Sequence, residues 1–170
     1  IGNGDSGPTR FTGQSKDGIP TDLRVVLVDI ARRMVVSQFL DTGITIEDKI
    51  SGVYDIKLIA GEESFVLQMV DDILANIPER YSLGQNYPNP FNPITKIDFS
   101  LPKTGYISLT IYNIMGQEIK TLISDNMQYG FHTTTWNGQD RFGRLVSSGV
   151  YFSELRAKGF RQTKKMLMLK

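Results

Sequence analysis

The residue types best suited to acid–base chemistry are few in this sequence, and their spacing does not bring them together. Histidine occurs once, at His132, where it alternates with Thr134 and Trp136 in a threonine-rich stretch. A general base or a metal ligand needs partners, and none is evident around it. The adjacent pairs Glu62-Glu63 and Asp71-Asp72 would point to opposite faces of a strand, which does not suit paired-carboxylate catalysis. We therefore predict no catalytic residues.

Metal and cofactor chemistry is equally unsupported. Cysteine is absent, which excludes disulfides, thiol nucleophiles and thiolate metal sites. No nucleotide-binding, serine-hydrolase or zinc-protease motif occurs. Residues 2–7 and 137–140 carry oxygen ligands at short spacing, but neither run ends in the glutamate of a calcium loop. We expect turns at both places, no metal, no cofactor and no enzyme activity.

Charge divides the chain into two unlike halves. Residues 1–83 hold 8 Lys and Arg against 13 Asp and Glu, a net of −5, whereas residues 84–170 hold 11 against 5, a net of +6. Either the halves dock or the basic half approaches an anionic surface, or these are ordinary solvated faces. Aromatic residues are not interleaved with the basic ones, so we predict no nucleic-acid binding. No apolar run is long enough for a transmembrane helix.

The acidic half reads as an arm followed by a small β module. Residues 1–20 are rich in Gly, Ser, Asp and Thr, which predicts a flexible arm. Residues 21–78 form the module, with strands predicted at residues 23–29, 34–38, 43–47, 53–60 and 64–69 and a helical turn or linker at 71–77. In the fourth of these strands, alternation predicts that Tyr54, Ile56 and Leu58 face inward.

Five strands are fewer than the roughly seven of an immunoglobulin-like sandwich. The module is therefore either an incomplete sandwich, completed by a strand from another chain or by upstream sequence, or a small five-stranded domain. An incomplete sandwich would favour self-association by strand addition.

A proline-rich segment, residues 79–93, follows. Pro88, Pro90 and Pro93 fix φ and remove backbone donors, which disfavours a helix or a central strand. We predict a stiff linker from which Tyr87 and Phe91 pack against the edge of the next module.

Residues 94–170 carry a regular series of strand signals separated by turn signals. Strands are predicted at residues 95–101, 106–112, 117–123, 131–136, 150–157 and 163–169. Trp136 is expected to anchor the core, and Gly116, Gly138, Gly143 and Gly149 to lie where φ is positive or the backbone approaches closely. The predicted fold is all-β: two immunoglobulin-like β-sandwich modules joined by the proline-rich linker.

The motifs of this half, taken in order, resemble the type A C-terminal sorting domain of the type IX secretion system. The residues that carry the resemblance are Asn86, Tyr87, Pro88, Asn89, Pro90, Phe91, Asn92, Pro93, Gly116, Gln117, Trp136, Gly138, Gly149, Tyr151, Lys164, Lys165 and Lys170. The flagellar hook-capping family shares the Tyr-Asn, Gly-Gln and Trp-Asn-Gly elements, but the proline-rich opening favours the sorting domain.

The resemblance implies a partner and a location. Such a module is recognised by an outer-membrane translocon, so the protein would be secreted or displayed at the cell surface after crossing the periplasm and the outer membrane. The domain is often cut off near residues 81–85 and replaced by a lipopolysaccharide anchor, although some relatives keep it. Residues 20–29 and 54–66 more weakly resemble the closing strands of the β-sandwich that often precedes this sorting domain in surface proteins.

Two functions follow. The first is a non-catalytic C-terminal region of a secreted or surface protein, whose last domain is the recognition signal for type IX secretion. The alternative is a structural subunit of an extracellular filament or surface layer, which retains the domain and assembles with copies of itself by strand exchange.

Overall fold

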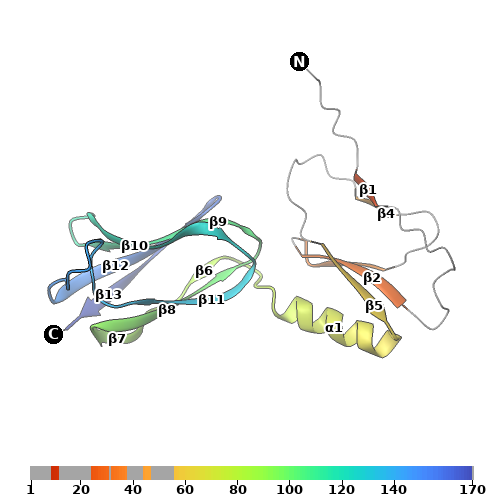
Figure 1. Ribbon diagram of the computed structural model, residues 1–170, viewed down its shortest axis with the longest axis horizontal. Helices are drawn as coiled ribbons and strands as arrows, with labels where there is room; N and C mark the ends of the chain where they lie inside the picture. Colours follow the sequence, from red (N-terminus) through yellow and green to blue (C-terminus); the bar gives the residue numbers. More distant parts are fainter. Residues whose placement is uncertain (1–8, 12–23, 31, 38–43, 47–55, 170) are drawn as a thin grey trace, which may run out of the picture. The chain divides into compact units, whose positions relative to one another are not determined.

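The computed structural model describes residues 9–11, 24–30, 32–37, 44–46 and 56–169 (Figure 1). The chain divides into two compact units, Ile1–Ala75 and Asn76–Lys170, which we describe separately. Strands predominate throughout the described residues, and α1 is the one helix among them, so the prediction of an all-β protein is confirmed.

The first unit contains two small antiparallel sheets and one helix. Its elements are β1 (Thr9–Phe11), β2 (Arg24–Asp29), β3 (Met34–Ser37), β4 (Ile44–Ile46), β5 (Ile56–Gly61) and α1 (Glu63–Ala75). One sheet has the order β3-β2-β5, and the other pairs β1 with β4. Residues 9–11 of the predicted arm are therefore a strand paired within the chain, while the rest of residues 1–20 lie outside the described residues.

The strand predicted at residues 64–69 is wrong, because this segment lies inside α1. The helix also includes residues 71–75 of the predicted turn or linker. Val66 and Val70 are its buried residues, and Ile73 and Leu74 are half-buried. This spacing of three and four residues is the period of an amphipathic helix, which a short apolar window does not distinguish from a strand.

The inward face predicted for the fourth strand is also wrong. In β5, Leu58 is 59% exposed, whereas Ile59 is buried and pairs with the buried Val26 of β2. Apolar residues occupy both faces of this strand, so alternation alone does not identify the buried one. The third residue of that prediction, Tyr54, lies outside the described residues.

The second unit is built from eight strands. They are β6 (Ser82–Leu83), β7 (Tyr87–Asn92), β8 (Ile94–Leu101), β9 (Gly105–Asn113), β10 (Glu118–Met127), β11 (Gly130–Trp136), β12 (Gly149–Ala157) and β13 (Phe160–Met168). The six strands predicted in residues 94–170 are confirmed, with ends shifted by a few residues. Figure 1 shows them as two layers, one containing β9, β10 and β12 and the other β8 and β11.

The proline-rich segment is a strand of this unit and not a linker. The strand order is β10-β9-β12-β13-β7-β8-β11, with β6 also paired to β8. β7 pairs in parallel with β13 through Phe91 and Met168, and antiparallel with β8. β7 therefore joins the two layers along one side of the sandwich. We call this side, formed by β7 and the parts of β13 and β8 next to it, the joined side.

The core lies between the two layers. Its buried residues are Leu83, Phe91, Ile97, Phe99, Leu101, Ile107, Leu109, Ile111, Trp136, Tyr151, Leu155, Met166 and Met168. Trp136 is fully buried, as predicted. The alternating apolar residues of β8 and β9 all face this core, so each of those strands has one apolar buried face.

Candidate functional site

Asn86 is buried at the beginning of the joined side and fixes the start of β7. Its Nδ2 donates to the Pro88 carbonyl and to Thr95 Oγ1, each at 2.9 Å, and Thr95 Oγ1 donates to the same carbonyl at 2.9 Å. Gln85 Nε2 donates to Asn86 Oδ1 at 2.7 Å. A buried amide with all of these partners holds the proline-rich strand in one position.

Hydrogen bonds that involve side chains and carbonyls of the proline-rich segment supplement the pairing of β7 with β13. The backbone N–H of Leu169 donates to the Phe91 carbonyl at 2.9 Å, and that of Leu167 donates to Asn89 Oδ1 at 2.9 Å. Gln85 Nε2 also donates to the Lys165 carbonyl at 2.8 Å. At Phe91 and Asn89 the segment supplies acceptors, which neighbouring prolines permit because proline removes only the backbone donor.

Three aromatic rings connect β7, β11 and β12 inside the core. The Trp136 ring centroid is 5.5 Å from that of Phe91 and 5.2 Å from that of Tyr151. The polar atoms are satisfied, since Trp136 Nε1 donates to the Gln139 carbonyl at 2.9 Å and the Tyr151 hydroxyl to the Ser147 carbonyl at 2.7 Å. Burial also raises the pKa of Tyr151 above its ordinary value. These motif residues hold the two layers together.

Gly138 is required both by its conformation and by its surroundings. Its φ is +68°, and a Cβ added there would lie 2.9 Å from Met168 Cε and 3.0 Å from the Pro93 carbonyl oxygen. A side chain would collide with the end of the joined side, so this motif glycine permits a close backbone approach.

Gly116 and Gln117 belong to a tight turn between β9 and β10. Asn113 Oδ1 accepts the N–H groups of Met115 and Gln117 at 3.0 and 2.9 Å, and Asn113 Nδ2 donates to Gln117 Oε1 at 2.8 Å. Gly116, with φ +75°, donates its N–H to the Asn113 carbonyl. Ile114 and Met115 are each 72% exposed at its tip.

A second tight turn lies between β11 and β12. Asp140 Oδ1 accepts the N–H groups of Phe142 and Arg144 at 2.8 and 3.0 Å, and Arg144 Nε donates to Asp140 Oδ2 at 3.0 Å. Desolvation opposes ionisation of Asp140, but these hydrogen bonds and the Arg144 charge outweigh it and lower the Asp140 pKa below its ordinary value. Phe142 is 67% exposed.

The remaining motif residues lie at several places. Both Tyr87 and Phe91 were predicted to pack against this module. Phe91 is buried, but Tyr87 is 79% exposed, so the prediction for Tyr87 is wrong. Pro88, Asn89, Pro90 and Asn92 are exposed, Pro93 and Gly149 are half-buried, and Lys170 lies outside the described residues. Lys165 is exposed on β13 and Lys164 is half-buried. The structure thus gathers the proline-rich segment, Trp136, Gly138 and Tyr151 at the joined side and separates them from Gly116 and Gln117.

Sequence reasoning missed a charge cluster on the outer face of β12 and β13. Glu154 is buried and accepts from Arg156 Nε at 2.5 Å and from Arg161 Nε at 2.6 Å. Burial alone would raise the Glu154 pKa, but the two arginines lower it below its ordinary value. The cluster lines a hollow of about 300 Å³ that also reaches Ile114. The sequence could have indicated this cluster only through the pairing of the predicted strands at residues 150–157 and 163–169, which places Glu154 near Arg161.

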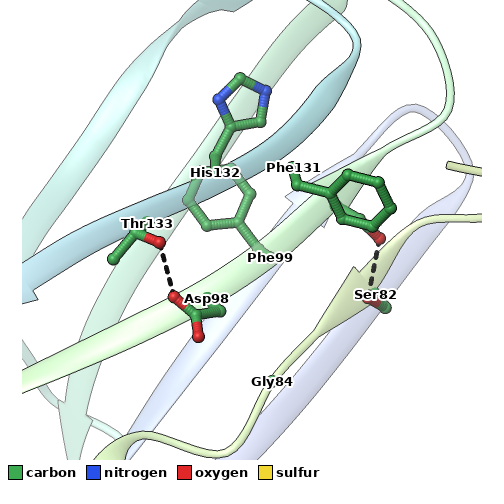
Figure 2. Close-up of a pocket in the computed structure, with 8 residues that line it drawn as sticks. Ser82, Gly84, Asp98, Phe99, Phe131, His132 and Thr133 are labelled. Carbon is green, nitrogen blue, oxygen red and sulfur yellow. Dashed lines mark hydrogen bonds between the residues drawn. The ribbon is translucent and has the colours of Figure 1, made fainter. Parts of the chain in front are cut away.

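A second hollow, of about 370 Å³, lies beside β6 on the face of β8 and β11 (Figure 2). Phe131 lines it, 69% exposed, and Thr133 Oγ1 donates to Asp98 Oδ1 at 2.6 Å. His132 stacks on Phe99 with ring centroids 5.2 Å apart. None of these residues belongs to the motif series.

Within the part of the chain that the structure describes, no helix has the length and apolar character needed to span a membrane.

These observations define a β-sandwich module whose sequence motif builds one side of the fold and one exposed turn. The family of secretion system C-terminal sorting domains matches residues 85–169, and the chain belongs to this family. Carrying this domain places the protein among those secreted to the cell surface or the exterior through the type IX system.

Solved structures that match parts of the chain include the following three. PorZ, a surface component of the type IX secretion system of Porphyromonas gingivalis, is 17% identical with a TM-score of 0.36, covering 53% of this chain and 11% of PorZ. FlgD from P. aeruginosa is 19% identical with a TM-score of 0.35, covering 44% and 59%. Dimeric latent PorU from Porphyromonas gingivalis is 11% identical with a TM-score of 0.42, covering 89% and 17%.

The chain thus spans a minor part of PorZ and PorU and less than two thirds of FlgD. No curated protein sequence matches it.

Proposed function

We propose that this chain is the non-catalytic C-terminal region of a secreted or surface protein, and that its second unit is the signal by which the type IX outer-membrane translocon selects it. The observation that carries the proposal is the family match over residues 85–169. This range falls within one compact unit, residues 76–170. The signal is therefore a folded module. Its partner binds the surface of this module and not an extended peptide.

A role in binding rather than catalysis is supported by two acidic groups in this unit. Asp140 and Glu154 each form ion pairs with arginine, and both have lowered pKa values. A general acid or base at neutral pH needs a raised carboxyl pKa. These two carboxylates form ion pairs that stabilise the fold.

The test fuses residues 76–170 to the C-terminus of a reporter that is already exported to the periplasm, in a bacterium with a type IX system. We expect the reporter on the cell surface or in the medium, and its retention in the periplasm when the translocon is disabled. The reporter without the fusion is the control for leakage. Surface display that persists without the translocon would contradict the proposal.

A further inference from the structure

The two tight turns of the second unit are the same five-residue structure made twice. In residues 113–117 and 140–144, position 1 is Asn or Asp, position 4 is glycine and position 5 is a long polar residue. The first side chain accepts the N–H groups of positions 3 and 5 in both turns. The N–H of position 1 donates to the carbonyl of position 5, and that of position 4 to the carbonyl of position 1, again in both turns. We call them the paired turns.

Both turns hold a large apolar side chain in water on a rigid support. Met115 and Phe142 occupy position 3 and are 72% and 67% exposed, and Ile114 beside Met115 is also 72% exposed. The hydrogen bonds within each turn remove backbone freedom that would let these side chains fold back. Exposed apolar residues gathered in one place indicate an interaction surface rather than the scattered ones found on any protein.

The paired turns lie next to each other. The backbone N–H of Arg141 donates to the carbonyl of Ile119 at 2.9 Å, only two residues beyond the end of the first turn. Figure 1 shows the β9–β10 and β11–β12 connections at the same end of the second unit. One partner surface can therefore contact both tips.

The charge around these tips is positive. The Arg141 and Arg144 guanidinium groups lie 4.9 and 5.0 Å from the centre of the Phe142 ring. Asp140 is already bonded to Arg144, which leaves the second turn with a net charge of +1 from two arginines and one carboxylate. The hollow beside Ile114 adds Arg156 and Arg161 around the single carboxylate of Glu154.

We propose that the paired turns are the docking surface of the sorting module, and that they bind a partner protein with an apolar pocket ringed by carboxylates. The inference rests on the proposed function, because the partner is the component of the export machinery that reads the module. Met, Phe and Arg are the residue types enriched at protein–protein interfaces, where Lys is depleted. A protein surface thus fits better than an anionic membrane, for which lysine serves as well.

The test replaces both tips in the full chain fused to the periplasmic reporter, as Met115→Ser with Phe142→Ser. The matched control is Phe131→Ser with Tyr106→Ser, which removes two aromatic side chains that are 69% and 58% exposed near the starts of β11 and β9, at the ends of these strands farther from the turns. We expect about a tenfold or greater loss of surface reporter for the tip variant, as for loss of interface hot spots. The control should export as the unchanged chain does, and both variants should keep its melting midpoint.

A charge variant tests the chemistry of the partner. Arg141→Glu keeps the turn, because the hydrogen bonds that Asp140 accepts come from Phe142 and Arg144. We expect a loss of export at least as large as that of the tip variant, since a carboxylate would then face carboxylates. Arg141→Lys should retain most of the export.

The outcomes separate this inference from the proposed function. If the unchanged chain is not exported, the proposed function fails. If it is exported and the folded tip variant is exported equally, only the docking surface is overturned. Binding of the purified chain to vesicles of phosphatidylcholine and phosphatidylglycerol that requires Phe142 would also overturn it, in favour of a membrane. Self-association abolished by the tip variant would overturn it in favour of a second copy.

Discussion

The joined side and the first of the paired turns both contain residues of the sequence motif, and they use these residues for opposite purposes. At the joined side, Asn86, Phe91 and Trp136 are buried, and their contacts link the two layers of the sandwich. At the paired turns, Met115 and Phe142 are exposed, and the polar residues beneath them make only local hydrogen bonds. A motif that identifies a family therefore mixes residues that build the fold with residues that hold a surface in place.

The largest difference between the two regions is expected for their aromatic residues. Trp136→Ala should lower the free energy of unfolding by about 3 to 5 kcal/mol, because it removes a fully buried ring and leaves a cavity. Phe142→Ala should change it by no more than about 0.5 kcal/mol, as most exposed substitutions do. Chemical denaturation of both variants checks this. If both substitutions lowered the free energy of unfolding equally, Trp136 and Phe142 would not differ in their contribution to the fold, which would contradict the comparison.

A smaller effect is expected for the buried amide of the joined side. Asn86→Ala leaves the Thr95 hydroxyl and the Pro88 carbonyl with one partner fewer, and should cost about 1 to 3 kcal/mol of stability. Asn137→Ala is the matched control, because Asn137 is exposed and bonds only to the nearby Gln139 side chain. Equal melting midpoints for Asn86→Ala and Asn137→Ala would indicate that the hydrogen bonds of Asn86 do not hold the proline-rich strand in place.

The smallest effect is a pH dependence that belongs to neither region. The Glu154 pKa is lower in the folded protein than its ordinary value of 4.5. Folding therefore favours the ionised form, and the resulting stability is complete above this value and is lost as pH falls through the lower folded-state pKa. Glu154→Gln has no such titration, so its deficit relative to the unchanged chain should shrink on acidification. Urea midpoints measured across this pH range give the comparison, and a constant deficit would contradict the assignment.

The strands of the second unit could be predicted where the apolar residues alternate onto a single face. The alternation of Ile97, Phe99 and Leu101 in β8 agrees with their burial. In the first unit the same reasoning failed at Leu58, where both faces are apolar, and at Val66, where a helical period was short enough to pass for a strand.

The role of the proline-rich segment could not be predicted from local chemistry. Proline removes backbone donors, and the sequence does not reveal that the N–H groups of the distant Leu167 and Leu169 donate to this segment. Likewise, Gly116 and Gly143 were expected where φ is positive or the backbone approaches closely, but the similarity of residues 113–117 to residues 140–144 appears only when the hydrogen bonds are compared. The shared pattern of a polar residue, two others and glycine was the available signal.

The most direct test of the account is the location of a periplasmic reporter fused to the full chain or to the chain lacking residues 76–170, in cells with an intact type IX system. If the second unit is the sorting signal, protease accessibility on whole cells should show the first fusion at the surface and the second retained in the periplasm. Equal surface display of the two fusions would contradict the central claim.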